Sequence, residues 1–152
     1  MLTKIFLGKP QYLFPTYKAT RKTIQIANRL YGKAHHKDNV TNAFRHALWN
    51  FLIAKKCFAQ NNSVEKSVAW AETITNLHEK LMPNKPLPKT MDLHNNFVGR
   101  KVFKKHYMLE TDEEIIKCFT ELIRQAQKVE NVKDITKDSL QLVYIEDYEN
   151  ER

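Results

Sequence analysis

The sequence predicts an all-α fold: a single compact domain of about five helices, with an irregular N-terminal arm and a short extended C-terminal segment. Apolar residues recur at helical spacing along most of the chain. Glycine is scarce, at three of 152 residues, which argues against β-sandwiches and glycine-rich phosphate-binding folds because both use glycine in their turns. The length and the 42% hydrophobic content are sufficient for one sizeable core.

The predicted domain has three parts: an arm over residues 1–19, a helical core over residues 20–130 and an extended tail over residues 131–152. The arm is expected to be irregular because Pro10 and Pro15 disfavour a continuous helix. The core contains the predicted helices and the polar residues that carry the functional argument. No internal repeat divides the chain further.

Five helices are expected, over residues 20–31, 41–58, 64–82, 90–107 and 111–129. Gly32 is placed to end the first, since glycine tolerates the backbone conformation that commonly follows a helix. Thr41 and Ser63 are the expected N-caps of the second and third. Thr111 followed by Glu114 predicts a capping box at the start of the last.

Irregular segments are expected between these helices. Three prolines predict a loop over residues 83–89. A polar loop over residues 33–40 contains His35 and His36, which are expected to be solvated. The β-prone run 140–145 predicts a short extended segment that packs on the helices without a partner strand.

The helix over residues 41–58 is the centre of the argument. Its apolar side chains lie nearly all round the axis, as in a buried helix. One narrow polar stripe interrupts them at Asn42, His46 and Asn50, spaced i, i+4, i+8, with Arg45 beside it. Buried polar groups cost stability unless they are hydrogen-bonded, paired or used. The stripe therefore predicts a polar partner inside the fold.

Two later helices repeat this anomaly. The first of them places Glu72, His78 and Glu79 at or beside its buried face. The next contributes Asp92, Asn95, Asn96 and Arg100. Because helical domains build internal sites from side chains on facing helices, the three sets predict one shared site.

The residue types indicate acid–base chemistry on a polar or anionic substrate, with water as the nucleophile. The predicted catalytic residues are His46 as general base or ligand, the pair His78 and Glu79, and Asp92 as the group that orients water. The expected substrate-binding residues are Arg45, Asn42, Trp49, Asn50, Asn95, Asn96 and Arg100. No Gly-x-Ser-x-Gly, catalytic-cysteine or Walker signature is present, so no nucleotide cofactor is expected.

A divalent metal ion bound at the same site is a more specific form of this prediction. If one is present, the expected ligands are His46, His78, Glu72 and Asp92, which supply two imidazoles and two carboxylates. The structural alternative stays open for each residue taken singly. A histidine on an apolar helix is often a hydrogen-bonded core residue, and the arginines can simply pair with the carboxylates.

Three blocks carry a family resemblance: Asn-Ala-Phe-Arg-His-Ala-Leu-Trp-Asn at 42–50, His-Glu at 78–79 and Met-Asp-Leu-His-Asn-Asn-Phe-Val-Gly-Arg at 91–100. They resemble an uncharacterised bacterial domain family, a domain of unknown function that also occurs at the ends of polymorphic-toxin-like proteins. The resemblance covers roughly residues 20–107 and implies an enzymatic, hydrolytic activity. The chain departs from the family pattern at Asn42, where Asp is common.

The bulk charge supports a second function class. The net charge of +8 favours an anionic partner, and a binding module for nucleic acid is the main alternative to an enzyme. A purely structural helical domain is the third possibility. No transmembrane segment is expected, and the chain is predicted to be cytoplasmic, with export by a route that needs no cleaved signal left open.

Overall fold

The all-α prediction is confirmed by the computed structural model, which describes residues 2–148. The described part contains six α-helices: α1 (Leu2–Gly8), α2 (Leu13–Tyr31), α3 (Val40–Asn61), α4 (Val64–Leu81), α5 (Pro86–His106) and α6 (Asp112–Arg124). Short 3-10 helices lie at Pro10–Tyr12, Ala34–His36 and Val132–Asp134. Two two-residue strands, β1 (Gln127–Lys128) and β2 (Val143–Tyr144), complete the fold.

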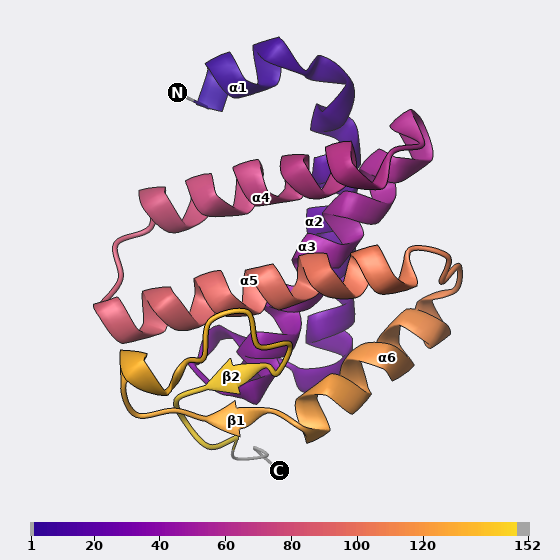
Figure 1. Cartoon of the computed structure of the whole chain (residues 1–152). Coiled ribbons are helices and arrows are strands. Elements are labelled where there is room, and N and C mark those ends of the chain that lie inside the picture. Colours follow the sequence, from indigo (N-terminus) through magenta and orange to yellow (C-terminus); the bar gives the residue numbers. More distant parts are fainter. Residues whose placement is uncertain (1, 149–152) are drawn as a thin grey trace.

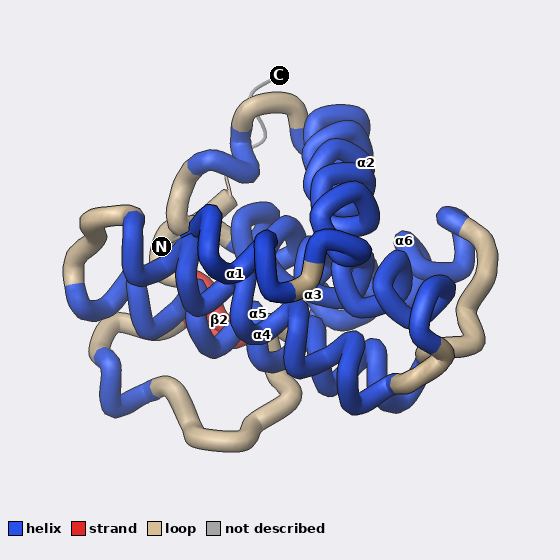
Figure 2. The backbone as a smooth tube through the Cα atoms, turned by 90° about the horizontal axis from the view of Figure 1, so that it is seen from above, coloured by secondary structure: helices blue, strands red, loops and turns tan. Residues whose placement is uncertain are grey.

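Helix α3 is the centre of the molecule. It packs against α2, α4, α5 and α6, so every long helix meets it. In Figure 1, α4 and α5 run one above the other in front of α2 and α3, with α1 above α4 and the strands below α5. Figure 2 shows from above how little of the backbone is strand. Among the described residues, no helix combines the length and apolarity needed to cross a bilayer.

The prediction of an irregular arm over residues 1–19 is wrong. Helix α1, a 3-10 turn and the first third of α2 occupy this segment, so α2 begins at Leu13 and not at residue 20. Pro10 opens the 3-10 turn, and Pro15 lies in the first turn of α2. A proline is tolerated at these places because the first amides of a helix have no acceptor within it.

The same reasoning corrects the predicted loop over residues 83–89, because α5 already begins at Pro86. Asn39, and not Thr41, caps α3: its side chain accepts hydrogen bonds from the amides of Thr41 and Asn42. Helix α6 ends at Arg124, short of residue 129, since β1 follows it.

The extended C-terminal segment does have a partner. Strand β2 pairs in parallel with β1, with Gln127 opposite Val143. Three of the predicted helix caps are confirmed. Gly32 ends α2 with a φ of 57°, Ser63 caps α4, and Thr111 with Glu114 forms the expected capping box. The sequence therefore predicted three of the four helix caps, with Thr41 the exception, but it did not predict the strand pairing.

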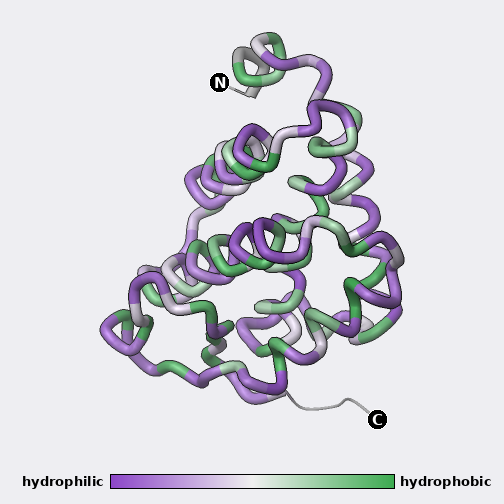
Figure 3. Tube along the Cα trace, turned by 45° about the vertical axis from the view of Figure 1, so that its right-hand side comes forward, coloured by the Kyte–Doolittle hydropathy of each residue, from purple (hydrophilic) through white to green (hydrophobic). Residues whose placement is uncertain are grey.

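The core is aromatic at its centre. The rings of Phe44, Phe51 and Phe103 are fully buried, and Phe119 of α6 joins them edge to face. Edge-to-face geometry is the arrangement that ring quadrupoles favour. Figure 3 shows hydrophobic and hydrophilic positions alternating around most helices, as expected when one face of each meets this core.

Helices α3 and α5 cross in backbone contact. A Cβ added at Gly99 would lie 2.1 Å from the carbonyl oxygen of Ala47, so only glycine fits at the crossing. Gly99 is flanked on α5 by Asn96 and Arg100, and Ala47 follows His46 on α3. The crossing therefore fixes the polar faces of the two helices against each other.

Candidate functional site

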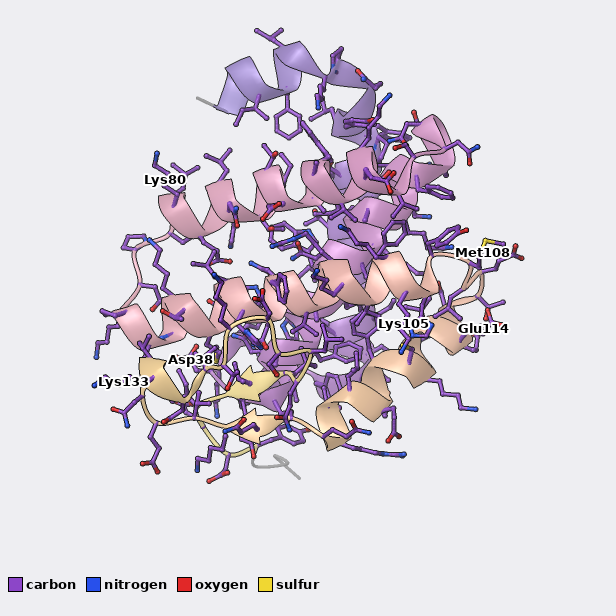
Figure 4. The ribbon with its side chains drawn as sticks, viewed as in Figure 1. Asp38, Lys80, Lys105, Met108, Glu114 and Lys133 are labelled. Atoms are coloured by element: carbon purple, nitrogen blue, oxygen red, sulfur yellow. The ribbon has the colours of Figure 1, made fainter. Side chains whose placement is uncertain are left out.

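Three buried side chains from three helices converge on one point. His46 comes from α3, Glu79 from α4 and Asp92 from α5, and each is less than one-tenth exposed. One potential ligand atom from each residue lies within 4.8 Å of the others. Figure 4 shows that side chains fill the space between α4 and α5 in front of α3, where these helices face each other.

Hydrogen bonds define the state of His46. Its Nδ1 lies 3.2 Å from Oδ1 of Asn96, while the Asn96 amide nitrogen donates to Oε1 of Glu79 over 3.3 Å. Oδ1 of Asn96 also accepts a 2.7 Å bond from Asn50, so it acts as an acceptor throughout. His46 must therefore carry its proton on Nδ1, which leaves the lone pair of Nε2 available.

Two groups face that lone pair. Nη2 of Arg45 lies 2.9 Å from Nε2 and can donate to it. Oδ1 of Asp92 lies 3.3 Å from the same nitrogen. This oxygen is buried and has no hydrogen-bond partner among the described residues. A buried carboxylate oxygen without a partner is costly in a fold that otherwise satisfies its polar groups.

The electrostatics of the cluster follow from its burial. Burial, then the positive charge of Arg45, lowers the pKa of His46 to about 3. Burial, reinforced by the nearby Glu79 carboxylate, raises the pKa of Asp92 to about 8. Burial also raises the pKa of Glu79. Arg45 is thus the principal positive charge among these groups, and burial lowers its own pKa from the usual high value.

A second polar network lies one turn along α3. The side-chain oxygen of Asn50 accepts from Thr75 at 3.0 Å and from Arg100 at 2.9 Å. Arg100 reaches on to Glu72, 3.4 Å away at the surface. Every polar atom of Asn50 is used, so this residue helps to hold α3, α4 and α5 in register and has no polar atom left for a ligand.

A pocket of about 270 Å³ leads to the cluster from the side of α2. Arg45 and His46 line it, and the rings of Trp49 and His78 meet edge to face in its wall, 5.2 Å apart. Its remaining lining residues are Thr20, Thr23, Ile24 and Met82. Of the cluster residues, the pocket therefore reaches His46, together with the neighbouring Arg45.

The structure thus brings some of the predicted site residues together and places others elsewhere. His46, Glu79, Asp92, Asn96 and Arg45 come together, whereas His78 and Trp49 lie in the pocket wall. The remaining predicted site residues lie outside the cluster: Glu72, Asn50 and Arg100 in the second network, and Asn95 and Asn42 elsewhere.

Asn95 points away from the site. Its amide donates to the carbonyl of Val143 and its oxygen accepts from the amide of Val143, so it holds β2 against α5. Asn42 is buried one turn before His46, and its Oδ1 has no hydrogen-bond partner among the described residues. Thr75 and Thr20 were missed because neither threonine stands out in the pattern of a helix; Thr20 accepts a bond from the Trp49 indole.

The three blocks that meet in this cluster lie inside a single family match. A family model described as "Domain of unknown function (DUF6973)" matches residues 3–127. The chain belongs to the DUF6973 family. The DUF6973 match includes all six α-helices and ends at β1, so the whole cluster and its pocket fall within it. No curated protein and no solved structure matched the chain.

Proposed function

We propose that this DUF6973 chain is a small hydrolase-like enzyme that acts on a polar or anionic substrate. The observation that carries the proposal is the convergence of His46, Glu79 and Asp92 within 4.8 Å, beside a pocket that His46 and Arg45 line. Buried groups of this kind, joined to a pocket, are the usual arrangement of an active site.

The roles follow from position. Above the raised pKa of Asp92, a water molecule beside Nε2 of His46 and the ionised Oδ1 of Asp92 would meet two acceptors for its protons, which is what activation of a nucleophile requires. Arg45 is placed to bind the anionic group or the charge that develops on the substrate. Asn96 holds His46 in the tautomer that directs Nε2 to this point.

The pocket restricts the substrate to a small group or the end of a larger molecule. Trp49, Ile24 and Met82 give it apolar walls, so the group that enters carries an apolar portion next to its polar centre. The toxin-like and bacterial context suggested by the sequence motifs fits a hydrolytic activity and forms part of this proposal, as does the predicted cytoplasmic location.

The test is a panel of chromogenic ester, phosphoester, amide and glycoside substrates. Asp92→Asn keeps the shape of the side chain and removes the ionisable carboxyl group, so the rate should fall about 100-fold or more while the fold is kept. Asp147→Asn, at an exposed carboxylate paired with Lys128, is the matched control and should retain the full rate. Equal rates for both variants would contradict the proposal.

His46→Ala is a weaker test. The imidazole is buried and bonded to Asn96, so its removal leaves a cavity and takes away one of the two hydrogen bonds to the Asn96 oxygen. Loss of activity in that variant would not separate chemistry from stability. If no substrate class is turned over and Asp92→Asn only stabilises the protein, the buried network serves to fix the fold.

A second candidate function rests on a separate groove of about 420 Å³ between α2, α3 and α6. Its basic lining residues are Lys18, Arg21, Lys22, Lys55 and Lys56. The rings of Phe14 and Tyr17 lie beside it, each more than half exposed and each with a cation nearby. Basic groups interleaved with exposed aromatic rings are typical of single-stranded nucleic-acid surfaces.

Fluorescence anisotropy with labelled single-stranded oligonucleotides tests this second function. Lys18→Glu should weaken binding, and affinity should fall steeply as salt is raised, because each phosphate contact releases counterions. Lys133→Glu, beside the strands in Figure 4, is the control. If the affinity does not change with salt, or if both variants weaken binding equally, the groove is not the nucleic-acid site. Two of its lysines already pair, with Asp112 and with the Leu109 carbonyl, which limits the free charge.

A further inference from the structure

We infer that His46, Glu79 and Asp92 form a binding site for one divalent transition-metal ion, such as Mn²⁺ or Zn²⁺. The inference concerns the same cluster as the proposed enzyme and deepens that function, since a bound ion would activate the water. It rests on the distances, the burial and one unsatisfied atom, and it needs no assumption about the substrate.

The three ligands are close enough to bind an ion after small side-chain movements. Metal–nitrogen and metal–oxygen bonds of about 2.0–2.2 Å place neighbouring ligand atoms roughly 3–4 Å apart. The potential ligand atoms of the three residues lie within 4.8 Å of one another, and Oδ1 of Asp92 is 3.3 Å from Nε2 of His46. One imidazole with two carboxylates is a donor set that suits Mn²⁺, Fe²⁺ and Zn²⁺.

The unsatisfied atom is the independent observation. Asp92 is 7% exposed, and its Oδ1 faces His46 without a hydrogen-bond partner among the described residues. A metal ligand needs an oxygen in this condition, with free lone pairs inside a buried site. Metal coordination would satisfy the oxygen that the protein's own donors leave alone.

Asn96 supplies the supporting contact that metal-binding histidines usually have. By accepting the proton of His46 Nδ1, its side chain holds the ring and leaves Nε2 to coordinate. Its amide also donates to Oε1 of Glu79, so the same residue orients two of the three ligands. One asparagine in this position ties both ligands to α5.

Arg45 must move aside before an ion can bind at Nε2 of His46. Its Nη2 lies 2.9 Å from Nε2, in the direction the ion would occupy, so the guanidinium and the ion compete. Arg45 also lines the pocket, which gives its side chain a place to move. Removing this positive charge should therefore tighten ion binding.

Isothermal titration of chelator-treated protein with MnCl₂ and with ZnCl₂ tests the inference. We expect one saturable site that Asp92→Asn and Glu79→Gln each weaken more than tenfold, and that Arg45→Gln tightens about tenfold. Circular dichroism checks that each variant is folded. If Asp92→Asn does not fold, Glu79→Gln alone provides the test. His106→Gln, at a histidine far along α5, controls for adventitious binding and should change nothing.

Three results would overturn the site: no saturable binding up to about 1 mM of either ion, binding unchanged in both carboxylate variants, or weaker binding in Arg45→Gln. The outcome is separable from the proposed activity. If the ion binds as expected but no substrate is hydrolysed, the proposed activity is refuted and the metal site is supported. Hydrolysis that is lost in Asp92→Asn, in a protein that binds no ion, refutes the site and leaves the enzyme.

Discussion

Gly99→Ala is the sharpest test of how the helices are held together. The added Cβ would lie 2.1 Å from the Ala47 carbonyl oxygen and 2.7 Å from its carbonyl carbon. Ordinary contact begins at 3.4 Å, so α3 and α5 must separate by about 1.3 Å at the crossing (3.4 − 2.1). The obstacle is backbone, which no side-chain rotation can relieve.

The magnitude follows from two opposing effects. Overpacking costs about 1–3 kcal/mol, and the separation would stretch the bonds from Asn50 to Asn96 and from Arg100 to Asn50, at about 0.5–1.5 kcal/mol each. Alanine regains about 1 kcal/mol of helix propensity. We expect a net loss of about 1–5 kcal/mol in the free energy of unfolding, which lowers the thermal midpoint by roughly 2–20 °C for a chain of this size.

Urea denaturation of the wild type and two variants measures this loss. Gly8→Ala is the matched control, since its new Cβ would meet nothing within 4 Å and should leave the stability within about 0.5 kcal/mol. If Gly99→Ala is as stable as Gly8→Ala, the close crossing of α3 and α5 is refuted, and with it the reason that their polar faces stay in register.

Two further predictions concern stability. His35 is fully buried, and burial, with the charges of His36 and Arg45, lowers its pKa to about 4. Because the unfolded chain takes up the proton first, near pH 6.5, the contribution of His35 to stability should fall as the pH drops from 6.5 towards 4, by about 2 kcal/mol between pH 7 and pH 5. Denaturation across that range should show a shallower fall in His35→Gln; an unchanged slope would rule out His35 as the source. Asn95→Leu should cost about 2–4 kcal/mol by removing both bonds to Val143, and amide exchange should accelerate in β2 while α4 keeps its protection. Equal protection of β2 in the variant and the wild type would contradict that role.

The sequence predicted best what is local to one helix. The stripe of Asn42, His46 and Asn50 lies on one face because i, i+4 spacing determines it within a single helix. The capping box at Thr111 depends only on residues three apart, and the structure contains it. Features of this kind need no knowledge of the rest of the chain.

Choices between neighbours could not be predicted, because tertiary contacts decide them. Glu72 and Glu79 lie two turns apart on one face of α4, and only the level at which α4 passes α3 places Glu79 at His46 and Glu72 at Arg100. Asn95 and Asn96 differ by about 100° around α5. One faces the strand and the other the site.

The N-terminal error had a different cause. Pro10 and Pro15 were interpreted as helix breakers, although proline also starts helices and the sequence alone does not say which role applies. The buried His35 is a related case. The polar composition of residues 33–40 predicted that His35 is solvated. Its ring is instead buried, and its Nε2 lies 2.8 Å from Oδ1 of Asn28.

The attachment of the C-terminal segment has a consequence for the order in which the chain folds. The carbonyl of Asp38, just before α3, accepts from the amides of Ile145 and Glu146, and Asn39 bridges to Glu146. These contacts join residues more than one hundred positions apart, so they form late and with a large loss of chain entropy. During synthesis, the helices that carry the cluster emerge well before the segment that secures the start of α3. The residues beyond the DUF6973 match would therefore attach last, against helices that already carry the cluster.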